Sequence, residues 1–182
     1  MAPATSAEAP TIQHPSQIVP AVLSVIGLAI GFIAGLLSWF VISGSNFTLL
    51  TDSYHALYVY GTQGGSALGM SSALGAALYK ASTSNPIVLV AFAIVLFFWP
   101  AMIVSSAFSL LIRSFGPYPF VWGLIAFVFA YIMMYYAGDS LGTGAYLDLV
   151  AAIIFLVASI TVRQARAVPA AAAPAPTAPP SS

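Results

Sequence analysis

Charge and cysteine are what this sequence lacks. Only four Lys or Arg and four Asp or Glu occur among 182 residues, so charged residues make up 4% of the chain. A soluble domain carries roughly a quarter charged residues, and so few charges cannot keep a folded surface hydrated. The basic residues form no cluster, which excludes nucleic acid as a partner. The chain has no cysteine, which excludes disulfides, thiolate-ligated metal centres and thiol catalysis within it.

Hydrophobic residues take the place of the missing charges. They make up 60% of the chain, and its mean hydropathy is +1.00. That is more apolar surface than one core can hide. A helix needs about 20 apolar residues to cross a hydrocarbon layer of about 30 Å, and four runs meet this requirement, at residues 21–42, 87–112, 119–137 and 145–162. The predicted fold is therefore an all-α integral membrane protein, a four-span helical bundle over residues 21–163.

The two ends of the chain have a different composition. Residues 1–20 and 164–182 are rich in Ala and Pro and show no apolar period, so we predict disordered tails. The first tail contains no Lys or Arg, which argues against a cleaved signal peptide.

Residues 43–85 allow two interpretations. The segment contains no run as apolar as the four spans. In the first interpretation it forms an interfacial or re-entrant helical segment packed on the bundle. In the second, residues 61–79 form a fifth span. With four spans, Arg113 falls on the same side as Arg163 and Arg166, and the positive-inside rule makes that side cytoplasmic. A fifth span splits the basic residues evenly between the two sides, so four spans are favoured. We expect a multi-pass protein of the cell membrane with both termini in the cytoplasm.

Small residues repeat every four positions in two places. Gly27, Gly31 and Gly35 share one face of the first span, since residues four apart lie above one another on a helix. A bare glycine face lets another helix approach closely. A second stripe follows in the segment after the first span, and the two stripes are either partners of each other or the first one faces another subunit. The second stripe consists of Gly61, Gly65, Gly69, Ala73 and Ala77.

Five of the ionisable residues lie on the predicted outer side, namely Asp52, His55, Lys80, Asp139 and Asp148. Asp52 and His55 share a helix face if that stretch is helical, and with Asp139 they are weak candidates for a metal site. No site is assigned on spacing alone. Asp148 lies inside the fourth span, where an ionisable group is costly and suggests a function or a specific partner. Lys80 is the only cation on that side, so we expect it to pair with Asp148 or with Asp139.

Cofactors receive little support from the sequence. The chain has two histidines, and only His55 lies near a predicted span, which excludes bis-histidine haem ligation within one chain. The third span is rich in aromatic residues, which could line a quinone or pigment surface but more often contact lipid or pack in the core. We therefore expect no cofactor, and we expect lipid as a partner.

These patterns support three functions in descending order. The first is a non-catalytic accessory or structural subunit of a larger membrane complex, or a self-assembling tetraspan, with other membrane subunits or itself as partner. The second is a channel or transporter component that uses Asp148 and the outer acidic groups. The third is a subunit of a membrane electron-transfer or oxidase enzyme. The order of spans resembles that of claudin-like tetraspan proteins, but the outer-loop Trp and paired Cys of those proteins are missing, and no family is assigned.

Overall fold

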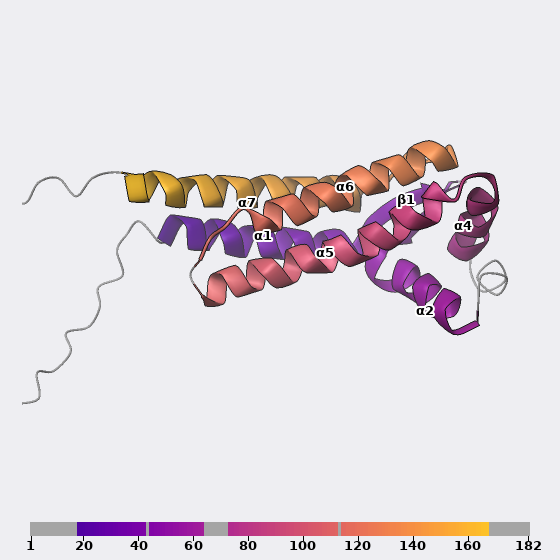
Figure 1. Ribbon diagram of the computed structural model, residues 1–182, viewed down its shortest axis with the longest axis horizontal. Coiled ribbons are helices and arrows are strands. Elements are labelled where there is room, and N and C mark those ends of the chain that lie inside the picture. Colours follow the sequence, from indigo (N-terminus) through magenta and orange to yellow (C-terminus); the bar gives the residue numbers. More distant parts are fainter. Residues whose placement is uncertain (1–17, 43, 64–72, 113, 168–182) are drawn as a thin grey trace, which may run out of the picture.

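The described part of the chain has four long helices. They lie side by side, and a group of short elements covers one end of them (Figure 1). The computed structural model describes residues 18–42, 44–63, 73–112 and 114–167. In chain order its elements are α1 (Ile18–Leu36), β1 (Ser38–Ile42), β2 (Ser45–Thr48), the π-helix η2 (Leu49–Ser53), α2 (Tyr54–Gln63), α4 (Ala73–Ser84), α5 (Ile87–Leu111), α6 (Tyr118–Ala137), β3 (Ser140–Leu141) and α7 (Thr143–Ala167). The predicted tails, apart from residues 18–20 and 164–167, lie outside the described residues.

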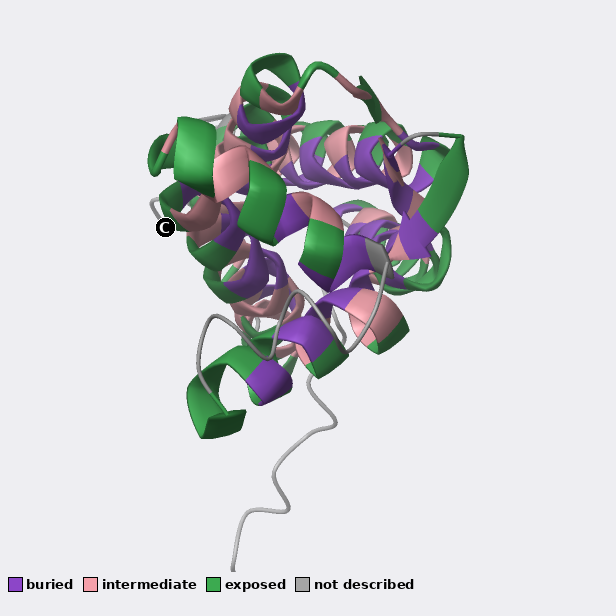
Figure 2. Ribbon diagram, turned by 90° about the vertical axis from the view of Figure 1, so that its right-hand side faces the viewer, coloured by how far each residue is buried: buried purple, intermediate pink, exposed green. Residues whose placement is uncertain are grey.

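Four of the described helices are long and apolar enough to cross a membrane, which is consistent with a multi-pass helical bundle. They are α1, α5, α6 and residues 143–163 of α7. Buried residues lie on the helix faces turned toward the other helices, and exposed residues lie on the outer faces (Figure 2). Two helix boundaries lie beside residues that commonly end or begin helices. The side-chain oxygen of Asn85 accepts a hydrogen bond from the backbone N–H of Ile87, where α5 begins. Gly138 ends α6 with φ of 76°, a conformation that suits glycine.

The predicted end of the first span is wrong. The helix stops at Leu36, and residues 38–42 form a strand. The indole N–H of Trp39 donates a 2.7 Å hydrogen bond to the carbonyl of Ala34, in the last turn of α1, where carbonyls lack helical partners. Trp39 and Phe40 are fully buried and belong to the core.

The strand β1 is the centre of a small antiparallel sheet with the order β2-β1-β3. Phe40 lies opposite Phe47 of β2 on one side and Leu141 of β3 on the other. The N–H of Gly142 donates a 2.8 Å hydrogen bond to the carbonyl of Trp39. Irregular backbone beside apolar helices is stable only when its polar groups are paired, and this sheet pairs them. The fold is therefore mostly helical but not all-α.

The sheet, α2 and α4 occupy one end of the bundle, which we call the sheet end (Figure 1). The start of α1, the turn between α5 and α6, and the end of α7 lie at the opposite end, which we call the turn end. The helices α2 and α4 have 10 and 12 residues, fewer than the roughly 20 needed to cross a membrane. The described part of the segment after α1 thus forms two strands, the π-helix η2 and two short helices beside the four long helices.

The glycine face of α1 packs against α5 and α7 of the same chain. A Cβ atom added at Gly27 would lie 2.9 Å from the ring of Phe155, and one at Gly31 would lie 2.8 Å from the methyl carbon of Met102. At Gly35 it would collide with the ring of Trp99. The first stripe thus serves a contact within the chain.

The described members of the second stripe lie elsewhere. A Cβ at Gly61 would meet nothing within 4 Å, and Ala77 lines a cavity at the sheet end. Gly65 and Gly69 lie outside the described residues, and so does the side chain of Ala73. In the described part of the chain, the partners of the first stripe are therefore not the second stripe, as one sequence alternative had it, but α5 and α7.

Candidate functional site

Asp148 is the one charged-type residue in the interior of the described bundle. It lies on α7, five residues after the helix begins, and its exposed fraction is 0%. Neither of its carboxyl oxygens has a hydrogen-bond partner among the described residues. More than nine in ten buried polar groups in proteins do have a partner. A fully buried carboxyl with both oxygens unpaired is therefore an exception that needs a reason.

Close helix contacts surround Asp148 along α7. One turn earlier, Gly144 lies against the indole of Trp39 and the carbonyl of Ala34. One turn later, the Cβ of Ala151 lies 3.7 Å from the Cβ position of Gly31 on α1. The neighbouring Ala152 is closer still to α6, because its Cβ lies 2.9 Å from the Cβ position of Gly123. Asp148 thus lies between points where α7 touches its neighbours through small residues.

Two indole N–H donors of this region are already in use. The N–H of Trp39 donates to the carbonyl of Ala34 over 2.7 Å, and that of Trp99 donates to the carbonyl of Gly31 over 3.2 Å. Both tryptophans are buried, and both serve the end of α1. The cost of burying an ionised carboxylate is several kcal/mol unless a partner offsets it. A bound proton would neutralise this carboxyl and remove the cost of burying its charge.

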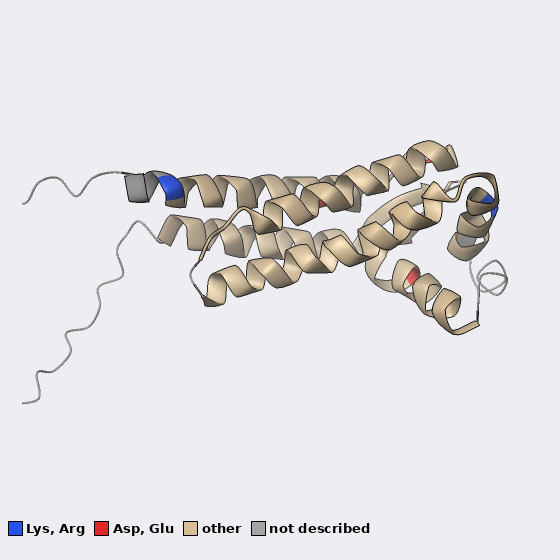
Figure 3. Cartoon of the chain, viewed as in Figure 1, with Lys and Arg blue, Asp and Glu red and all other residues tan. Residues whose placement is uncertain are grey.

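The structure places Lys80 apart from Asp148. Lys80 is exposed on α4, whereas Asp148 on α7 is fully buried. Figure 3 shows blue basic residues on the short helix at the sheet end and near the far end of α7. The predicted pair of Lys80 with Asp148 is wrong, because neither carboxyl oxygen of Asp148 has a partner. The alternative of Lys80 with Asp139 stays a prediction, since both side chains line the same cavity. Arg163 lies near the end of α7, and that end of α7 is at the turn end (Figure 1). The side chains of Arg113 and Arg166 lie outside the described residues.

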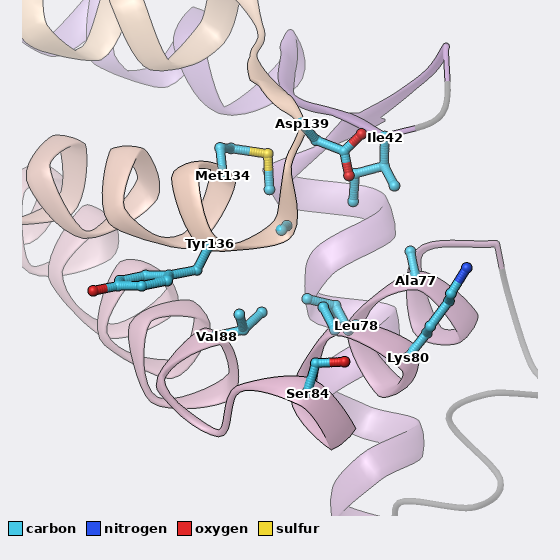
Figure 4. Close-up of a pocket in the computed structure, with 11 residues that line it drawn as sticks. Ile42, Ala77, Leu78, Lys80, Ser84, Val88, Met134, Tyr136 and Asp139 are labelled. Carbon is cyan, nitrogen blue, oxygen red and sulfur yellow. The ribbon is translucent and has the colours of Figure 1, made fainter.

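A cavity of about 290 Å³ opens at the sheet end (Figure 4). It is enclosed by α4, the first turn of α5, the last turn of α6 and the end of β1. Lys80 lines it from α4, and Asp139 lines it from the turn after α6. The side chains of Leu78, Val88 and Met134, all buried, form its apolar part. The cavity combines a cation, an anion and an apolar floor.

Asp52, one of the weak candidates for a metal site, instead caps a helical turn. The carboxylate of Asp52 accepts hydrogen bonds from the N–H and hydroxyl of Thr48, at 2.7 and 3.0 Å, and the Thr48 hydroxyl accepts from the N–H groups of Thr51 and Asp52 in return. This reciprocal cap starts the helical turn of η2. His55 is exposed. The described residues contain no group of three His, Cys, Asp or Glu that could hold a metal ion.

Sequence reasoning missed the roles of Thr48, Trp39 and Trp99. A signal for the first exists, because Thr48 precedes Asp52 by four residues in a polar stretch that begins a helical turn. The indole contacts with α1 carbonyls join residues as far apart as 31 and 99, and no local pattern reveals them. No family model, curated protein or solved structure matches this chain.

Proposed function

We propose that this protein is a component of a membrane transport system, without catalysis of its own, in which Asp148 is the ionisable group that carries the transported or coupling ion. The observation that carries this proposal is the complete burial of Asp148 with both carboxyl oxygens unpaired. Ionisable residues in membrane spans are costly and mark ion or proton pathways in membrane proteins. A merely structural acid would be expected to have a partner.

This ranking of the candidate functions differs from the ranking that the sequence favours. The sequence ranks a structural subunit first because the glycine face of α1 offers a surface to a partner. That face is occupied by Phe155, Met102 and Trp99 of the same chain, so it no longer supports a partner subunit. Asp148 gains weight at the same time, because its predicted pairing with Lys80 is absent.

The test is ion flux in liposomes that contain the purified protein. We expect flux of protons or sodium ions from the wild type, and loss of that flux in Asp148→Asn, which keeps the shape but removes the charge. Ser159→Ala is the matched control, because Ser159 is a buried polar residue of the same helix that bonds only to the carbonyl of Leu156 in the described structure. Equal flux in Asp148→Asn and the wild type, or wild-type flux no greater than in empty liposomes, contradicts the proposal.

A second candidate is the accessory or structural subunit, or a self-assembling tetraspan. It is favoured by an apolar groove of about 550 Å³ between α1 and α5, lined by residues that include Val25, Phe32 and Ile103. A helix from another subunit or from a second copy would bury this groove. Native mass spectrometry after gentle detergent extraction measures the stoichiometry directly. A monomer without co-purifying subunits contradicts this candidate.

We also propose that the protein lies in the cell membrane with its turn end, and hence both termini, in the cytoplasm. Arg163 lies near the end of α7, which is at the turn end, and cytoplasmic segments carry an excess of Lys and Arg. Because the chain has no cysteine, one introduced cysteine gives a unique label. In intact cells, a membrane-impermeant maleimide should label Ser84→Cys at the sheet end and spare Ser114→Cys at the turn end. The reverse pattern refutes the orientation.

A further inference from the structure

The cavity at the sheet end is built by parts of the chain that are far apart in sequence. Its walls come from β1, α4, α5 and α6 (Figure 4). Lys80 on α4 and Asp139 after α6 carry its opposite charges, and the charges sum to zero. Its volume of about 290 Å³ is comparable with that of a small polar headgroup rather than of a single ion. A ligand that matches these walls carries an anionic group and an ammonium group on a compact frame.

The surroundings of the cavity indicate where such a ligand comes from. It lies where α5 begins and α6 ends, at the boundary of two membrane-length helices. Tyr136 lines it and is exposed, and the adjacent Tyr135 of α6 is exposed as well. Tyrosines are enriched at the level of lipid headgroups. Its floor of Leu78, Val88 and Met134 is apolar. A membrane amphiphile can therefore reach the cavity while its acyl chains stay in contact with the apolar faces of the helices.

We propose that this cavity binds the headgroup of a zwitterionic phospholipid, with the phosphate at Lys80 and the ammonium at Asp139. An ammonium–carboxylate and a phosphate–ammonium contact are both charge-assisted, and they are stronger than contacts between neutral groups. The apolar floor excludes part of the water that would screen them. The bound lipid then links α4 to the ends of α5 and α6. This site is independent of Asp148 and of the transport proposal.

The experiment measures lipids retained by the full chain in native mass spectrometry. The protein is exchanged into detergent with equal amounts of phosphatidylethanolamine and phosphatidylglycerol of the same acyl chains. Both lipids carry the phosphate, but only the first carries the ammonium. We expect the wild type to retain phosphatidylethanolamine about fivefold more, which is the size of one exposed charge pair.

Two variants separate the roles of the two charges. Lys80→Met should lower the retention of both lipids, because it removes the phosphate contact. Asp139→Asn should lower only phosphatidylethanolamine, to the level of phosphatidylglycerol. Arg163→Met is the control, because it removes an exposed cation at the turn end and should leave retention unchanged. A circular dichroism melt verifies that each variant is folded.

Three results overturn the proposal. The first is equal retention of the two lipids by the wild type. The second is a folded Lys80→Met protein that retains phosphatidylethanolamine as the wild type does. The third is saturable binding of a water-soluble zwitterion such as an amino acid without any preference between the lipids, which assigns the cavity to a soluble ligand instead.

Discussion

Replacing Gly35 by alanine tests how α1 is held in the bundle. The added Cβ would collide with the ring of Trp99, which is 4% exposed and whose N–H bonds to the carbonyl of Gly31. Overpacking of a close contact costs about 1–3 kcal/mol, and a weakened buried hydrogen bond costs about 1 kcal/mol more. Alanine returns about 1 kcal/mol through its higher helix propensity. We expect a net loss of about 1–3 kcal/mol of unfolding free energy.

The same reasoning predicts an order among the glycines. Gly31→Ala should cost less than Gly35→Ala, because the nearest atom is the flexible end of Met102. Gly61→Ala is the control, since its Cβ would meet nothing within 4 Å, and it should be neutral or slightly stabilising. The assay is unfolding by sodium dodecyl sulfate in mixed micelles, followed by circular dichroism. If Gly35→Ala is as stable as Gly61→Ala, the close contact of α1 with Trp99 does not exist.

Three further substitutions test other parts of the structure. Trp39→Phe removes the N–H that bonds to the carbonyl of Ala34 and should lower the unfolding free energy by about 1–3 kcal/mol, measured in the same detergent assay. Thr48→Val removes the cap of η2 and should cost about 1 kcal/mol; proteolysis should then cut the segment after β2 faster than in the wild type. Burial raises the pKa of Tyr54 above its usual value of 10.0, and its hydroxyl donates to the carbonyl of Leu96. The folded state therefore holds this proton more tightly than the unfolded state does, so its contribution to stability is complete below about pH 10 and is lost as the pH rises through the higher folded pKa. A pH series of unfolding curves should show that loss in the wild type and a smaller one in Tyr54→Phe.

The long helices were predictable because length and composition determine them. A run of about 20 apolar residues has few alternatives in a membrane, and Asn85 before Pro86 marks the start of α5 in the sequence itself. The switch from α1 to β1 was not predicted. Residues 37–42 are as apolar as the helix before them, so hydropathy alone cannot separate the two. The aromatic and β-branched residues from Trp39 to Ile42 favour a strand, and this weaker signal was the correct one.

The candidate site, too, could be predicted from the local sequence only in part. The position of Asp148 inside an apolar run was visible in the sequence, and so was its cost. Its isolation was not, because the distance to Lys80 depends on how α4 lies against the bundle. The partners of Gly35 were also hidden, since Trp99 lies 64 positions further along the chain. The four-residue spacing of the glycines predicts that another helix packs closely on that face of α1. Only the tertiary structure shows which residues make the contact.

The central position of β1 has a consequence for biogenesis. β1 and β2 are adjacent in sequence and can pair as soon as both have been synthesised. The other edge of β1 must wait for β3, which follows only after α5 and α6. During synthesis, a strand edge with unpaired N–H and C=O groups therefore persists next to the membrane until two more helices have been inserted. Such an edge can pair wrongly, so truncation after α6 should yield a product that aggregates, whereas extension through β3 closes the sheet.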